Sequence, residues 1–219
     1  MLGRLCCLMW LATTLYAAPK QHVVSFGKWT IVKWFFAEDE NSARDVKIRP
    51  LLVDGRTKEF TVGAAHDITE RSFVVQRMYR LNDTLEQENS GPHWRWERGG
   101  WLIVDRNTGK VQSIALPGFD SYYSAAAWFR DYVAYCGLSD DGKSSYAVVS
   151  QVGKRKALLK KNIGNAADSD KPGSACPEPV WQRGPARVTF APQNDQKFTY
   201  TVRSREIGIV PEEDDPGEE

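Results

Sequence analysis

The feature that most constrains this chain is a succession of short runs of β-branched and aromatic residues, each ended by a turn signal. The clearest run, WLIVD at residues 101–105, is followed by the turn residues RNTGK and then by a second strand candidate at residues 111–116. The same design returns at residues 132–152, where the turn contains Asp141-Gly142. Apolar runs of this length, joined by turns in which glycine supplies a positive φ, are typical of antiparallel hairpins.

Similar runs extend over most of the chain. They cover residues 22–37, 46–53, 58–62, 72–81, 155–159, 186–190 and 197–202. No stretch between residues 22 and 210 keeps apolar residues at helical spacing over four turns. A short helix around residues 124–132 is the one exception that we expect. The sequence therefore predicts an all-β fold built of antiparallel sheets.

Residues 101–161 also resemble the blade repeats of bacterial β-propellers. In such blades an inner strand is followed by an Asp-Gly turn and then by a strand that ends near an Asp-x-x-Thr-Gly-Lys turn, as in SDDGK and VDRNTGK here. The resemblance implies a small propeller-like architecture of about four blades. The same strand pattern also suits a sandwich or an open, barrel-like sheet. No ligand-binding residue of these repeats has a counterpart in this chain.

The first 18 residues have the pattern of a secretory signal peptide. Arg4 is the only charge, and residues 5–18 are apolar or small hydroxyl residues, a run too short to cross a bilayer as a helix. A short membrane anchor or a core helix is the alternative. We therefore expect export to the periplasm or the extracellular space, with no membrane span after cleavage.

Cysteine usage agrees with export. Cys6 and Cys7 lie in the leader, so the mature chain keeps only Cys136 and Cys176, which we expect to form one disulfide in an oxidising compartment. A buried thiol and an unrelated exposed one are the alternative. The three histidines, at positions 22, 66 and 93, show no ligand-like spacing with these cysteines, so the sequence predicts no metal site and no cofactor.

Charge is unevenly distributed. The net charge of +1 gives no support for nucleic-acid binding. Residues 211–219 hold six acids and no base, which predicts a disordered acidic tail after a single all-β domain at residues 19–210. The one basic cluster comprises Lys154, Arg155, Lys156, Lys160 and Lys161. It is interpreted as protection of a strand edge, with binding of anionic polymers as the alternative.

Two short segments provide candidate ligand-binding residues. In PHWRWERGGW, Trp94 and Trp96 alternate with charged residues, so a strand would place both indoles on one side. Such a pair is either a core-facing stripe or an exposed platform for sugar rings or peptides. Farther along, Arg130 and Asp131 are adjacent and would either hold a ligand carboxylate or form a local ion pair at a turn.

No catalytic motif is present. The sequence has no nucleophile elbow, phosphate-binding loop, zinc-protease helix or dinucleotide fingerprint. His66 beside Asp67 has the composition of a general base, but the segment also suits a turn capped by Asp67. We therefore expect an exported, non-catalytic binding or structural module whose partner is a polysaccharide, a peptide or an envelope protein. The alternatives are an exported hydrolase of glycans or peptides and a subunit that docks on a larger envelope protein.

Overall fold

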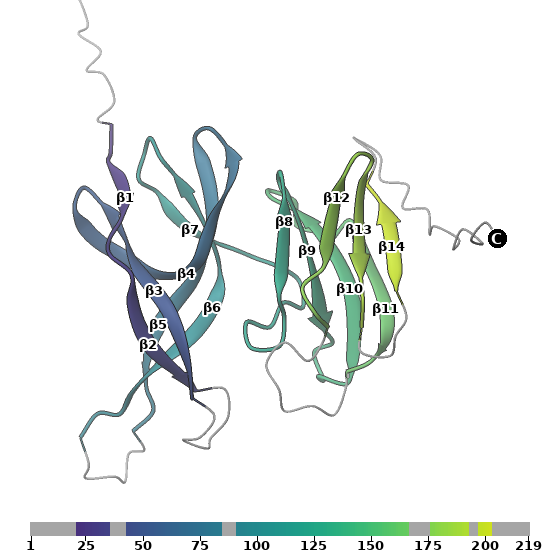
Figure 1. Ribbon diagram of the computed structural model, residues 1–219, viewed down its shortest axis with the longest axis horizontal. Helices are drawn as coiled ribbons and strands as arrows, with labels where there is room; N and C mark the ends of the chain where they lie inside the picture. The colour runs from purple at the N-terminus through teal and green to yellow at the C-terminus, as the bar shows by residue number, and fades with distance from the viewer. Residues whose placement is uncertain (1–20, 36–42, 85–90, 167–175, 193–196, 203–219) are drawn as a thin grey trace, which may run out of the picture.

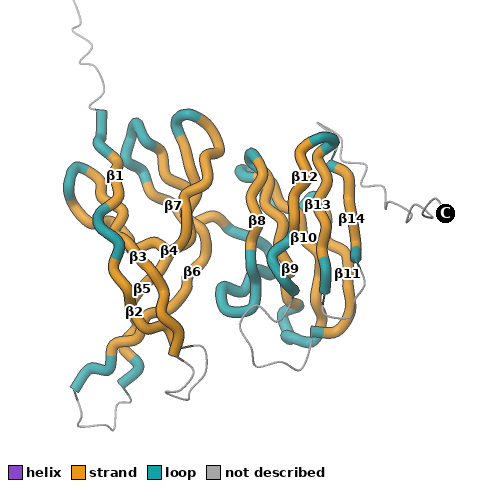
Figure 2. The backbone as a smooth tube through the Cα atoms, viewed as in Figure 1, coloured by secondary structure: helices purple, strands orange, loops and turns teal. Residues whose placement is uncertain are grey.

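The computed structural model describes residues 21–35, 43–84, 91–166, 176–192 and 197–202. Within these residues every regular element is a β-strand and no helix occurs (Figure 2). The predicted all-β class is thereby confirmed. The predicted leader at residues 1–18 and the acidic segment at residues 211–219 lie outside the described residues. None of the described residues belongs to a helix long and apolar enough to cross a membrane.

The first half of the chain forms a barrel (Figure 1). Its strands are β1 (Val24–Phe26), β2 (Thr30–Phe35), β3 (Ala43–Val53), β4 (Arg56–Thr69), β5 (Ser72–Asn82), β6 (Trp94–Asp105) and β7 (Val111–Ile114). Strands β2 to β6 pair with their chain neighbours in antiparallel fashion. The ring closes where β2 meets β6 in parallel, with Trp34 opposite Trp96. Strands β1 and β7 extend the sheet beside β3 and β6.

Local sequence explains the barrel's hairpins. Asp54 and Gly55 both have a positive φ, of 52° and 74°, which produces the primed turn that matches the twist of β3 and β4. At the next turn Thr69 accepts hydrogen bonds from the backbone N–H groups of Arg71 and Ser72. The Oδ1 of Asp105 accepts hydrogen bonds from the N–H groups of the two residues that lead into Gly109, before β7 begins. One face of the strands buries an apolar cluster of Leu51, Phe73, Val75, Leu102 and Val104.

The second half of the chain forms a sandwich of two antiparallel sheets. One sheet contains β8 (Ala126–Phe129), β9 (Tyr132–Leu138), β10 (Ser144–Gln151) and β11 (Leu159–Asn165), in the order β11-β10-β9-β8. The other contains β12 (Val180–Arg183), β13 (Ala186–Phe190) and β14 (Phe198–Thr201). The two sheets lie beside each other in Figure 1, separated from the barrel by the segment after β7.

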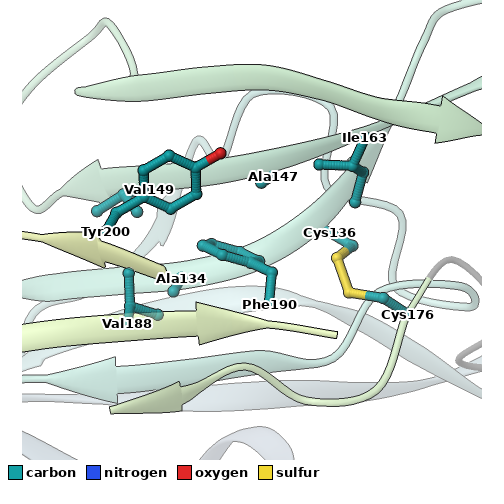
Figure 3. Close-up of a cluster of buried hydrophobic side chains, with 9 residues drawn as sticks. All are labelled: Ala134, Cys136, Ala147, Val149, Ile163, Cys176, Val188, Phe190 and Tyr200. Atoms are coloured by element: carbon teal, nitrogen blue, oxygen red, sulfur yellow. A yellow bond between two sulfur atoms is a disulfide. The ribbon is translucent and has the colours of Figure 1, made fainter. Parts of the chain in front are cut away.

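The two central strands of the four-stranded sheet, β9 and β10, are buried on both faces. Alternate residues of β9 and β10, such as Ala134 and Val149, face the three-stranded sheet and pack against Val188, Phe190 and Tyr200 (Figure 3). Cys136 and Cys176 form a disulfide in this core, with their Cα atoms 5.9 Å apart, so the predicted pairing is confirmed.

The segment between β7 and β8 packs on the other face of this sheet. The Tyr135 hydroxyl donates a hydrogen bond to the carbonyl of Pro117 at 2.9 Å, and the Ser124 hydroxyl donates one to that of Cys136 at 2.6 Å. The N–H of Leu138 bonds the carbonyl of Gly118 at 2.8 Å. Residues 116–124 are therefore attached to the sandwich rather than free between the two halves.

Two expectations need correction. The helix predicted around residues 124–132 is wrong, because residues 126–129 pair in antiparallel fashion with β9 and Arg130, at φ 53°, makes the turn between the two strands. The propeller-like arrangement is wrong, because the strands form a barrel and a sandwich. The resembling segment is divided, with β6 and β7 in the barrel and β8 to β11 in the sandwich. Of the alternatives, the barrel describes the first half of the chain and the sandwich describes the second half.

Candidate functional site

An exposed aromatic surface lies where β6 begins. Arg80 of β5 is the cross-strand partner of Trp96, and its guanidinium carbon lies 5.1 Å from the ring centroid of Trp94 and 5.8 Å from that of Trp96. One guanidinium can contact both indoles only if they share a face, as the alternation predicts. We call Trp94, Trp96, Arg80 and Phe60 the Trp94 platform.

The two indoles of the Trp94 platform differ in exposure. Trp96 is half-buried and meets Phe60 edge-to-face, with centroids 5.1 Å apart. Trp94 is 52% exposed, while Arg80 beside it is also exposed. A cation over an indole stabilises the ring's orientation by about 0.5–1 kcal/mol at an exposed site. The platform therefore exposes to solvent the indole of Trp94, whose orientation Arg80 stabilises, and the guanidinium of Arg80.

The other face of the same strand is built from charged contacts. Arg95 pairs with Asp83 at 2.5 Å and also covers the ring of Phe35 at 5.5 Å. Burial raises the pKa of Glu97, while hydrogen bonding with Trp34 opposes that rise. These side chains are engaged with one another, so the available surface at this end of β6 is the indole side.

The structure does not bring Arg130 and Asp131 to the platform. Trp128, two residues before Arg130, contacts Trp101 of β6 with ring centroids 5.1 Å apart. Arg130 and Asp131 therefore lie near Trp101 along β6. Trp94 lies seven residues earlier on the same strand, which corresponds to about 23 Å at an extended rise of about 3.3 Å per residue. The two candidate pairs therefore occupy separate surfaces.

Arg130 and Asp131 form the turn between β8 and β9, where the sandwich meets the barrel. Asp131 accepts a hydrogen bond from the side-chain amide of Gln151 at 2.7 Å, and its carbonyl accepts one from the N–H of Val152 at 2.9 Å. The Arg130 guanidinium lies over the ring of Phe129, 5.4 Å from its centroid. Both side chains thus have local contacts of the kind that organise a turn.

His66 of β4 contacts the same turn. Its Nε2 lies 2.8 Å from the carbonyl oxygen of Arg130, and its ring stacks on Trp128 with centroids 6.0 Å apart. A carbonyl only accepts, so the Nε2 must carry the proton. The carboxylate of Asp67 does not orient the His66 ring but forms an ion pair with Arg106 at 2.6 Å. The pair is therefore not arranged as a carboxylate-oriented general base.

A groove of about 440 Å³ lies beside this contact, between the barrel and the sandwich. Its apolar lining includes Ile103, Ile114, Leu116 and Val133, and Lys154 and Arg155 line it as well. Sequence reasoning missed this groove because its walls come from segments about 50 residues apart. Its signal in the sequence was Lys154 and Arg155, which belong to the basic cluster.

No group of three or more histidine, cysteine, aspartate or glutamate side chains within the described ranges is placed to hold a metal ion. No protein-family model matches the chain, and no characterised protein or solved structure is significantly similar to it.

Proposed function

We propose that this protein is an exported, non-catalytic binding module that holds its ligand on the Trp94 platform. The observation that carries the proposal is the exposed indole of Trp94 beside the guanidinium of Arg80, 5.1 Å away. Large exposed aromatic side chains are costly in water and are enriched where proteins bind other molecules. The platform contributes one exposed indole, a second half-buried indole and one cation, a composition suited to binding.

The chemistry of the platform favours a polysaccharide or a peptide. An indole face packs against the apolar C–H face of a sugar ring or against an apolar side chain. The planar guanidinium of Arg80 supplies several N–H donors for hydroxyl, carbonyl or carboxylate oxygens beside that contact. The four residues of the platform include no acid, hydroxyl or thiol, so the proposal assigns no reaction to them.

Export is supported by two independent features. The leader-like sequence at residues 1–18 predicts passage out of the cytosol, and the disulfide between Cys136 and Cys176 is stable in an oxidising compartment. Together they favour a ligand that is met outside the cytosol, such as a cell-envelope polysaccharide or peptide.

Fluorescence titration of the mature chain tests the proposal. The probes are soluble peptidoglycan fragments, oligosaccharides of neutral and uronic-acid sugars, and an extended peptide library. We expect the emission of Trp94 to shift with one probe class and Trp94→Ala to weaken that binding by about tenfold or more.

Trp29→Ala is the matched control, because Trp29 is 47% exposed and also lies under an arginine, with Arg49 4.4 Å from its ring. It should bind the probe as the unmodified protein does. Equal affinity of Trp94→Ala and the unmodified protein for the bound probe would contradict the proposal. So would turnover of the probe.

A further inference from the structure

We propose that the groove between the barrel and the sandwich binds an extended, acidic peptide segment of a partner protein, laid beside β7. This site is separate from the Trp94 platform and does not depend on it. Three properties of the groove carry the inference: a strand edge, an apolar floor and a cationic rim.

The strand edge comes from β7. Residues 112–114 of β7 and the two residues that follow the strand line the groove in succession. Because side chains of a strand alternate between faces, a consecutive set indicates that the backbone itself borders the groove. Within the described chain β7 pairs only with β6. Its other side therefore presents backbone N–H and C=O groups, which an added strand can pair with.

The floor is apolar and comes from both halves of the molecule. Ile103 and Ile114 belong to the barrel, and Val133 belongs to β9 of the sandwich. Leu116 comes from the segment that is attached to the sandwich, and packs against Tyr135 and its neighbours. An extended peptide presents every second side chain to such a floor, which favours apolar residues at alternate positions.

The rim is cationic. Lys154 and Arg155 are exposed and follow a tight turn in which Gly153 has φ 80° and the N–H of Lys154 bonds the carbonyl of Gln151. Neither side chain forms an ion pair with another described residue, and the residues that line the groove include no acid. Charge complementarity therefore favours acidic residues at the remaining positions of the peptide.

These properties together select a peptide over other anions. A nucleic acid or a sulfated sugar would satisfy Lys154 and Arg155 but would leave the edge of β7 and the floor of Ile103, Ile114 and Val133 unused. An extended peptide with alternating apolar and acidic side chains engages all three features at once. The groove is thus a site of β-strand addition with electrostatic selection.

The test uses the mature full-length chain and a fluorescein-labelled peptide of alternating valine and glutamate, followed by anisotropy. Binding is expected, and Lys154→Glu with Arg155→Glu should weaken it by about tenfold or more. The matched control is Lys28→Glu with Lys47→Glu, since both lysines are exposed on the barrel and the change in net charge is the same. This control and Trp94→Ala should bind the peptide as the unmodified protein does.

Several results would overturn the proposal. One is unchanged affinity for a peptide that is N-methylated at alternate residues, because it would show that the edge of β7 is not used. Another is equal, Lys154-dependent binding of heparin, which would indicate a general polyanion site. A third is binding by a chain lacking residues 211–219 but not by the full chain, which would assign the groove to the protein's own acidic segment.

Discussion

The imidazole Nε2 of His66 donates a hydrogen bond to the backbone carbonyl of Arg130 at 2.8 Å and thereby joins β4 of the barrel to the β8–β9 turn of the sandwich. The contact is reinforced by stacking of the His66 ring on Trp128 and by the edge-to-face contact of Trp101 with the same indole. The positive φ of Arg130, 53°, belongs to the turn that presents this carbonyl. A few side chains thus connect the two halves beside the groove.

His66→Phe is expected to lower the free energy of unfolding by about 1 kcal/mol, because the phenyl ring retains stacking on Trp128 but the Arg130 carbonyl loses its donor. Urea denaturation followed by tryptophan fluorescence measures the change. His93→Phe is the control, since His93 is exposed just before β6, and it should leave stability unchanged. Identical midpoints for His66→Phe and the unmodified protein would show that the bond contributes nothing.

Arg130→Gly separates the backbone role of this residue from its side chain. A left-handed conformation costs a non-glycine residue about 1 kcal/mol, so glycine at φ 53° should leave stability equal or raise it by up to that amount. Arg130→Ala removes the same guanidinium without relieving the backbone and should be the less stable of the two in urea. If both variants bind the probe of the Trp94 platform normally, the guanidinium of Arg130 takes no part in that site.

Features encoded within a few residues were predictable from the sequence. The Asp54-Gly55 and Asp141-Gly142 turns and the strands around them are read from local turn chemistry, and the disulfide follows from the two cysteines that remain after the leader. Features that depend on pairing between strands far apart in the sequence could not be predicted. Ala126 and Ala127, whose residue type favours a helix, lie in strand β8 because β9 supplies the hydrogen-bond partners of that strand. The closure of the barrel at Trp34 and Trp96, and hence the separation of Trp94 from Arg130, likewise depends on long-range pairing.

Replacing both cysteines, as Cys136→Ala with Cys176→Ala, should lower the free energy of unfolding by about 4 kcal/mol. This value follows from loss of a cross-link with a sequence separation of 40 residues in the chain-entropy model. Urea denaturation of the variant and of the unmodified protein, each with and without reductant, provides the measurement. Reductant should destabilise only the unmodified protein. Equal stability of the variant and of the unmodified protein in the absence of reductant would mean that the cross-link does not stabilise the sandwich.

Stability should fall at alkaline pH because of Tyr135. Burial raises the pKa of its phenol to about 12, whereas the unfolded phenol ionises near pH 10. Above pH 10 the unfolded chain therefore holds fewer protons than the folded one, so stability is complete below pH 10 and declines by about 2–3 kcal/mol as the pH rises to about 12. Burial also raises the pKa of Tyr200, which acts in the same direction.

Urea denaturation at about pH 9 and about pH 11.5 measures this loss. Tyr135→Phe should be less stable than the unmodified protein at pH 9, because it lacks the hydrogen bond to Pro117, but should lose less stability on going to the higher pH. Tyr79→Phe, at a half-buried position of the barrel, should keep the full pH dependence. A pH dependence in Tyr135→Phe as steep as in the unmodified protein would assign the loss to other groups.

Gly118→Ala should destabilise the sandwich through the segment that connects it to the barrel. Gly118 has φ 69°, and an added Cβ would lie 2.8 Å from the carbonyl oxygen of Leu138, whose N–H bonds the Gly118 carbonyl at 2.8 Å. Gly142→Ala is the control, because φ is 70° there and nothing lies within 4 Å of the added carbon. The control should lose about 1 kcal/mol from backbone strain alone, and Gly118→Ala should lose about 1–2 kcal/mol more.

Displacement of this segment also moves Leu116, so Gly118→Ala should bind the acidic peptide more weakly, whereas Gly142→Ala should not. Equal urea midpoints for the two variants would show that residues 116–124 can move without loss of stability and do not hold the groove in place.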